Sequence, residues 1–137
     1  CEPPARDEPG PMRSAARPVD GPEAALGPDG LGMAVYRRVR ACLTGFGDLE
    51  VRPTTSQVAF RRRRGFADLR DPRRALGRGA VEVVLSIALP RADRSPRFKQ
   101  VIHVAHRVWM HHLELRSVDE VDEPIVALLL EAASAAG

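Results

Sequence analysis

The sequence predicts an α+β fold, a two-layer sandwich in which an antiparallel sheet of about five strands is flanked by an N-terminal and a C-terminal helix. Apolar residues recur at helical spacing near residue 35 and again after residue 124. Between these segments, short runs alternate apolar and polar residues, as half-buried strands do. The length of 137 residues and the 44% hydrophobic content are typical of one globular domain, which we expect over residues 31–137.

Residues 1–30 are expected to form a disordered tail, because proline, glycine and alanine dominate and large apolar side chains are few. Such a segment buries too little surface to offset the conformational entropy that it would lose on folding. Cys1 in this tail and Cys42 in the domain form no disulfide pattern, so we expect a cytoplasmic protein. No apolar run approaches the ~20 residues that span a bilayer, so no membrane partner is expected.

The first helix is predicted over residues 31–44. Its apolar residues recur three or four positions apart, and its arginines lie on the other side. The apolar positions are Val35, Val39, Cys42, Leu43 and Phe46. Cys42 is therefore expected to be a small buried residue, and Gly45 and Gly47 are expected to end the helix.

A β-hairpin is predicted after this helix, because apolar and polar residues alternate on one side of an arginine-rich tip and an apolar segment follows it. Val58 and Phe60 are expected to face the core. The segments are a short extended piece at 48–52, a strand at 55–62, the tip that ends at Gly65 and a strand at 66–69.

The strongest strand pattern lies over residues 81–89, where branched apolar side chains dominate. Glu82 and Ser86 are expected to mark its wetter face, and Pro90 ends it. A polar loop over residues 91–100 leads to two further predicted strands, at 101–104 and 108–115.

The last element is predicted to be a helix with Asp122 as its N-cap, because Pro124 is tolerated only in the first turn of a helix. Val121 and Val126 are placed to form a hydrophobic staple. The expected buried face consists of Ile125, Leu128, Leu129 and Ala132.

Common catalytic patterns are missing from the sequence, so we predict no catalytic residue, no cofactor and no metal. Four histidines, His103, His106, His111 and His112, lie close together, but their spacing turns neighbouring strand side chains to opposite faces. No cysteine pair completes a tetrahedral site. No nucleophile elbow, phosphate-binding loop or dinucleotide fingerprint occurs. We expect His111 to be packed or to lie at an interface, and His112 to be solvated.

Positive charge is concentrated in the middle of the chain. The net charge is +3, but residues 52–107 contain fourteen basic and four acidic residues. Phosphate backbones favour arginine clusters through counterion release, without any reading of the bases. The predicted anion-binding residues are Arg61, Arg62, Arg63 and Arg64 at the hairpin tip, extended by Arg73 and Arg74. The alternative is a solvated surface whose charges keep the hairpin edge soluble.

Several short motifs follow one another in a distinctive order. They are the run Pro53–Phe60 with the pair Phe66-Ala67 after it, the run Ser95–Phe98, the run His111–Leu115, and an aspartate-rich turn into a leucine-rich helix. In this order they resemble a bacterial family, the domain of unknown function 5655. The resemblance covers roughly residues 33–137.

The resemblance implies no established activity. Related domains stand alone or are attached to predicted nucleases, which implies a role close to nucleic acid. The family pattern has Lys at the position of Thr55 and Thr at that of Ser56, so an anion contact by that Lys would be missing here. Some similar proteins carry a cysteine-rich ribbon, but Cys1 has no partner cysteines for one.

Three functional hypotheses follow. The leading one is a non-enzymatic module that binds a polyanion such as nucleic acid, or a protein, through its basic face. The second is a small-molecule site or an unrecognised enzyme with a pocket between the sheet and the helices. That pocket would be lined by Thr55, Ser56, Trp109 and His111, although core packing is the competing interpretation of Trp109. The third is a self-association surface on an exposed strand edge.

Overall fold

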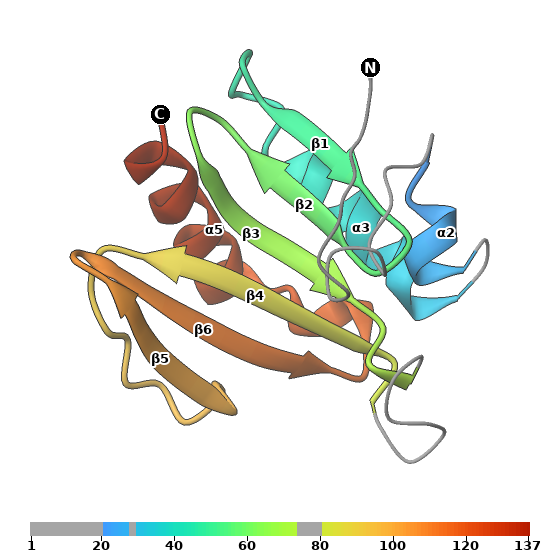
Figure 1. Ribbon diagram of the computed structural model, residues 1–137. Coiled ribbons are helices and arrows are strands. Elements are labelled where there is room, and N and C mark those ends of the chain that lie inside the picture. The colour runs from blue at the N-terminus through green and yellow to red at the C-terminus, as the bar shows by residue number, and fades with distance from the viewer. Residues whose placement is uncertain (1–20, 28–29, 74–80) are drawn as a thin grey trace, which may run out of the picture.

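Figure 1 shows the computed structural model, which describes residues 21–27, 30–73 and 81–137. The helices are α2 (Glu23–Leu26), α3 (Leu31–Cys42) and α5 (Glu123–Ala135), with a 3-10 turn η2 (Val118–Glu120) before the last of them. The strands are β1 (Glu50–Pro53), β2 (Val58–Arg61), β3 (Gly65–Arg70), β4 (Val83–Leu89), β5 (Gln100–Ala105) and β6 (Val108–Leu115).

The strands form one antiparallel sheet in the order β1-β2-β3-β4-β6-β5. The predicted α+β class is confirmed. The described part of the sheet has six strands where about five were expected, because the extended piece before Pro53 pairs with β2. Helices α3 and α5 lie together on one face of the sheet, behind it in Figure 1, so the domain has two layers.

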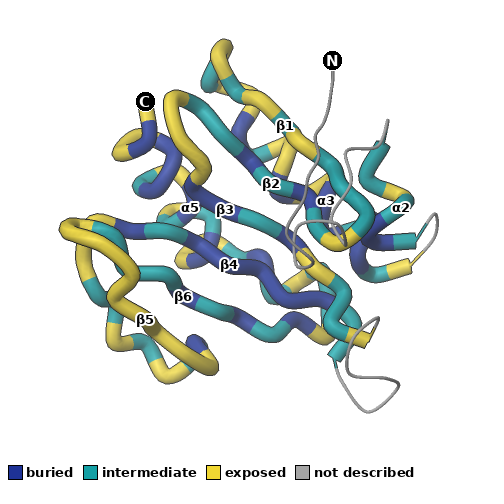
Figure 2. The backbone as a smooth tube through the Cα atoms, in the orientation of Figure 1, coloured by how far each residue is buried: buried dark blue, intermediate teal, exposed yellow. Residues whose placement is uncertain are grey.

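The hydrophobic core lies between the sheet and the two long helices. Val58 and Phe60 of β2 face this core, as expected, and both are fully buried. The same face continues across the sheet, because Leu85 in β4 pairs with Leu69 on one side and with Leu113 on the other. Figure 2 shows the buried positions concentrated on the central strands, whereas β5 is exposed along its whole length.

The N-terminus of α5 is built as the sequence predicts. The Asp122 side chain accepts the Ile125 N–H, and Pro124 lies in the first turn. Arg97 donates to both carboxylate oxygens of Asp122, at 2.9 and 3.1 Å, and this contact holds the pKa of Asp122 below its usual range. The cap therefore also fastens the β4–β5 loop to the helix.

The expectation of a disordered segment up to residue 30 is wrong for residues 23–26, whereas residues 1–20 and 28–29 lie outside the described residues. These residues form α2, whose Ala25 and Leu26 are buried against α3 and β3. Gly32 permits this approach, because a Cβ at that position would lie 3.0 Å from the Leu26 Cβ. Two apolar side chains are thus enough to attach a short helix to the core, although the surrounding composition favours disorder.

Several expected burial states also differ from the structure, among them that of Leu128, which is only partly buried. Cys42 is half-buried rather than buried, because Leu43 takes the inward position at the end of α3. Ser86 is 1% exposed although it was assigned to the wetter face of its strand. It lies on a central strand, so neighbouring strands on both sides cover it. In the part of the chain that the structure describes, no helix has the length and apolar character to cross a bilayer.

Candidate functional site

One end of the sheet gathers the arginine-rich tip and the only tryptophan. The tip connects Arg61 of β2 to Gly65 of β3. Because the strands are antiparallel, the end of β4 lies at this same end, where Leu89 pairs with Trp109 of β6. We call this end the arginine end: it comprises the β2–β3 tip (61–65), the end of β4 and the β5–β6 turn (105–108). In Figure 1 these features lie along the left end of the sheet, the β2–β3 tip above and the end of β4 and the β5–β6 turn below.

Thr55 and Ser56 lie at the opposite end of the sheet, in the turn between β1 and β2. The Thr54 Oγ1 accepts the N–H groups of Ser56 and Gln57 there, at 3.2 Å each. The structure therefore does not bring Thr55 and Ser56 to Trp109, with which they were expected to form one pocket.

Arg73 also lies away from the arginine end, just after β3. Its guanidinium donates to both carboxylate oxygens of Asp71, at 3.0 and 2.8 Å. Arg74 lies outside the described residues. The predicted extension of the anion site through Arg73 is therefore not continuous with the hairpin tip.

Arg62 at the hairpin tip has partners within the domain. Its Nη1 donates to the Ala133 carbonyl at 2.8 Å, and its Nε donates to Asp48 at 2.8 Å. This bond holds the pKa of the Asp48 carboxyl below its usual range. The guanidinium carbon lies 4.6 Å from the centre of the Phe46 ring. Arg62 thus connects the hairpin to α5 and to the segment after α3.

Arg63 and Arg64 of the tip supply hydrogen-bond donors to the C-terminus of α5. The Ala136 carbonyl accepts the backbone N–H groups of Arg63 and Arg64, and the Ala135 carbonyl accepts the Arg64 Nη2 at 2.8 Å. The last carbonyls of a helix have no intrahelical partners and carry partial negative charge, so cations and N–H groups stabilise them. Arg63 and Arg64 are nevertheless exposed to solvent.

Replacing Arg62 by Ala is expected to lower the free energy of unfolding by about 1–2 kcal/mol, because the Ala133 carbonyl and the Phe46 ring both lose a charged partner. Replacing Arg63, whose side chain is exposed, is expected to change it by less than about 0.5 kcal/mol. Urea denaturation of the two variants measures the difference. Equal stabilities would show that Arg62 is only a surface charge.

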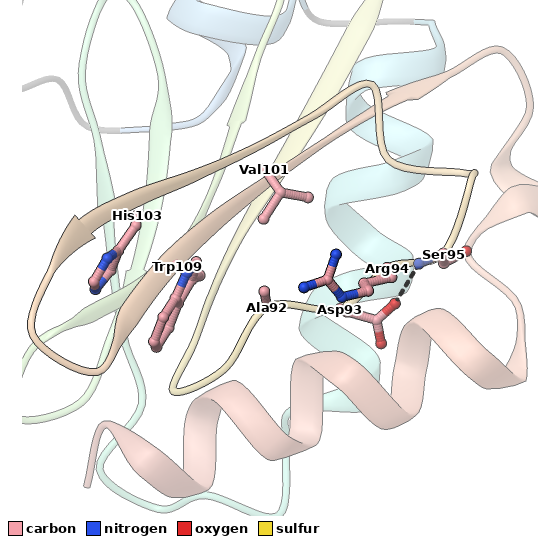
Figure 3. A pocket seen from close by; sticks show the side chains of 7 residues that line it. All are labelled: Ala92, Asp93, Arg94, Ser95, Val101, His103 and Trp109. Atoms are coloured by element: carbon pink, nitrogen blue, oxygen red, sulfur yellow. Dashed lines mark hydrogen bonds between the residues drawn. The ribbon is translucent and has the colours of Figure 1, made fainter.

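A cavity of about 460 Å³ lies at the arginine end, between the β4–β5 loop and the β5–β6 hairpin (Figure 3). It is open to solvent rather than enclosed. It is lined by Ala92, Asp93, Arg94, Ser95, Val101, His103 and Trp109. Trp109 therefore lines a pocket on the helix-bearing side of the sheet rather than packing wholly inside the core.

An aromatic stack forms one wall of this cavity. His103 and Trp109 are direct cross-strand partners, and their rings lie 4.1 Å apart at an interplanar angle of 7°. His103 is exposed and Trp109 is half-buried. Figure 3 shows both rings side by side at one end of the cavity. Such a pair offers a flat, partly solvated surface to another ring.

The opposite wall is a loop that α5 holds in place. Arg91 donates to both carboxylate oxygens of Glu131, at 2.9 and 2.7 Å, and Arg97 binds Asp122 further along. Arg94, between these two anchors, has no hydrogen-bond or ion-pair partner among the described residues and lines the cavity. The loop thus presents one unpaired guanidinium opposite the aromatic stack.

His111 fixes the inner part of the same loop. It is fully buried, and its Nε2 accepts the Asp93 N–H at 2.8 Å. An amide N–H can only donate, so Nδ1 carries the ring hydrogen and donates to the Trp109 carbonyl at 3.0 Å. Phe98 packs edge-on against the ring at 5.0 Å. His111 is therefore packed, as expected, and it supports the cavity without lining it.

The β5–β6 turn adds a cation next to the stack. Arg107 has a φ of 59°, in the left-handed region that residues other than glycine rarely adopt. Its side chain and that of His106 are exposed. A strained conformation persists only where the surrounding structure imposes it, and here it holds an arginine at the tip of the hairpin.

A polar row crosses the open face of the sheet, away from the cavity. Asp68 pairs with Ser86, and Ser86 pairs with His112, whose Nδ1 lies 2.7 Å from the serine Oγ. Burial raises the pKa of Asp68 to about 6, against the opposing effect of Arg70. Burial also lowers the pKa of His112, which is half-buried rather than solvated. Ser86 is too deeply covered to reach a substrate.

Sequence reasoning did not identify His103 and Arg94 as site residues. The predicted strand boundaries could have identified His103, because a short turn after Ala105 makes His103 the cross-strand partner of Trp109. Arg94 had no such signal, since only the ion pairs of its neighbours leave it unpaired. The described residues contain no group of three or more side chains suited to hold a metal ion.

The comparisons with known proteins identify the family. The model of the domain of unknown function (DUF5655) matches residues 30–134, which is most of the chain. The chain belongs to this family. The match begins just before α3 and ends within α5, so the DUF5655 domain contains the whole described sheet and the cavity. No curated protein and no solved structure matches the chain.

Proposed function

We propose that this DUF5655 domain is a non-enzymatic binding module for single-stranded nucleic acid. A base would stack against His103 and Trp109, and Arg94 across the cavity would contact a phosphate. The observation that carries this proposal is the exposed stack at 4.1 Å beside an unpaired arginine in a cavity of about 460 Å³. Proteins that bind single strands combine these two features, an aromatic platform and a cationic track.

The charge at the arginine end supports this proposal. Arg63 and Arg64 at the β2–β3 tip and Arg107 at the β5–β6 turn are exposed at the same end of the sheet as the cavity. A single-stranded nucleic acid with one base in the cavity would therefore have cations on both sides for the phosphates next to that base. The hairpin arginines would contribute charge rather than specificity, because phosphate contacts carry no sequence information.

The only tryptophan reports directly on the cavity, so titration of its fluorescence tests the proposal. Single-stranded oligonucleotides are expected to quench Trp109, with an affinity that falls about 50-fold between 50 and 200 mM salt if about four phosphates are bound. The variants Arg94→Ala and His103→Ala are each expected to weaken binding tenfold or more.

The matched control is Arg37→Ala, an exposed arginine on α3, which is expected to bind like the wild type. Inorganic polyphosphate that binds as tightly as the oligonucleotide would contradict a role for base stacking. Undetectable binding at low salt would exclude the proposal altogether.

A free planar anion is the second candidate ligand, because the cavity is large enough to hold a nucleotide-sized molecule. The same fluorescence titration with mononucleotides distinguishes a single-stranded nucleic acid from a free planar anion as the ligand. If a mononucleotide binds as tightly as the oligonucleotide and with little salt dependence, the domain is a small-molecule binder.

A further inference from the structure

Strand β5 is an unprotected edge of the sheet. All six of its residues, Gln100–Ala105, are exposed. Four large apolar side chains are exposed in the described part of the chain, and three of them are on this strand: Val101, Ile102 and Val104, at 38, 39 and 54%. The strand contains no charged residue and no proline, which are the usual means of preventing edge-to-edge pairing.

The other edge of the sheet differs in each of these respects. Strand β1 has four residues, among them Glu50, Arg52 and Pro53. Charges and proline on a short strand block the addition of a further strand. The two edges are therefore not equivalent, and only β5 is suited to accept a partner strand.

We propose that β5 pairs with β5 of a second copy of this chain, in antiparallel orientation about a two-fold axis. The outward N–H and C=O groups of a strand edge are solvated in the monomer and can instead pair with another strand, and β5 is itself an uncharged strand of matching length. Pairing β5 with the β1 edge of the next copy would generate an open-ended chain of molecules, whereas β5 with β5 closes after two copies. This proposal does not depend on the identity of the ligand.

The pairing places the two cavities next to each other. A two-fold axis between antiparallel neighbours in one sheet is perpendicular to that sheet, so both pairs of helices lie on the same face. Val101 and His103 of each copy line its cavity and belong to the paired strand. The two cavities therefore open on the same side of a continuous sheet, on either side of the axis.

The interface is expected to be weak. Stable specific interfaces involve about 20–30 residues from each partner, and a strand of six residues provides far fewer. The bulge between His103 and Ala105 shortens the regular part further. We therefore expect a monomer–dimer equilibrium that depends on protein concentration, rather than a permanent dimer.

Sedimentation velocity over a wide range of protein concentration tests the proposal. The wild type is expected to shift from the mass of the 15.0 kDa chain toward twice that mass as its concentration rises. The variant Ile102→Lys puts a charge near the middle of the paired strand, close to the two-fold axis of the dimer. This variant is expected to remain monomeric. Val104→Lys, further along the strand, serves as a second edge variant if the first does not fold.

The matched control is Leu130→Lys on α5, where an equally exposed apolar side chain lies away from the edge. This control is expected to dimerise like the wild type. A wild type that stays monomeric at every concentration overturns the proposal, and so does a dimer that survives both edge substitutions. A loss of dimer in Leu130→Lys alone would place the interface on α5 and equally contradict pairing through β5.

Discussion

Replacing Asp68 by Asn is expected to raise the free energy of unfolding by about 2–3 kcal/mol at about pH 8, and by almost nothing at about pH 4. Burial raises the pKa of this carboxyl from 3.8 to about 6 in the folded protein. One of its oxygens, Oδ1, is buried without a hydrogen-bond partner among the described residues. The Arg70 Nε, at 3.9 Å, only partly compensates the buried charge.

The sign of the effect follows from the direction of the shift. A carboxyl whose pKa is higher in the folded state binds its proton more tightly there, so it favours folding while it is protonated. That contribution is complete below pH 3.8, the ordinary pKa, and is lost as the pH rises through about 6. Asn cannot ionise, so the variant keeps at high pH the stability that the wild type loses.

Urea denaturation of the wild type and Asp68→Asn between about pH 4 and pH 8 measures this difference. Other titrating groups are common to both proteins and largely cancel in the comparison. Asp119→Asn, at an exposed position in η2, is the control, and its stability is expected to change with pH as that of the wild type does. If the stability difference between Asp68→Asn and the wild type is the same at every pH, burial does not raise the pKa of Asp68.

Replacing His111 by Ala is expected to lower the free energy of unfolding by about 3 kcal/mol or more. The substitution leaves a cavity in the core, and it leaves the Asp93 N–H without its partner. For a domain of this size the melting temperature should fall by roughly 10 °C. Because the β4–β5 loop is attached to the sheet through this bond, the Asp93 amide should also exchange its hydrogen faster than in the wild type.

The control for His111→Ala is His106→Ala in the exposed β5–β6 turn, which is expected to melt like the wild type. His111→Phe separates packing from hydrogen bonding, because Phe refills the volume but cannot accept the Asp93 N–H. We expect its stability to lie between those of the wild type and His111→Ala. A fully stable Phe variant would mean that the hydrogen bond contributes nothing.

Local sequence determines much of this fold. The alternation around Val58 and Phe60 and the helical spacing through Val35 and Val39 are physical requirements of a strand or helix with one buried face. The N-cap at Asp122 is equally local, because it depends on residues within one turn. The class of the fold, the core and the beginning of α5 could therefore be predicted from the sequence.

The candidate site could be predicted from the sequence only in part. The residues chosen for their chemistry were divided between the two ends of the sheet, with Thr55 and Ser56 at one end and Trp109 at the other. The direction of each strand decides at which end its turn lies, and this follows from the order of the strands in the sheet. Composition and spacing do not contain that order.

The sequence by itself determined the α+β class, the buried faces and the concentration of arginine in the middle of the chain. Only the tertiary structure decided which arginine side chains are available to bind a ligand. Whether an arginine is hydrogen-bonded within the domain depends on residues that are distant in sequence. Arg62 is held by a carbonyl of α5, whereas Arg94 is left unpaired by neighbours that bind α5 instead. Such contacts depend on how the layers pack, which no local pattern encodes.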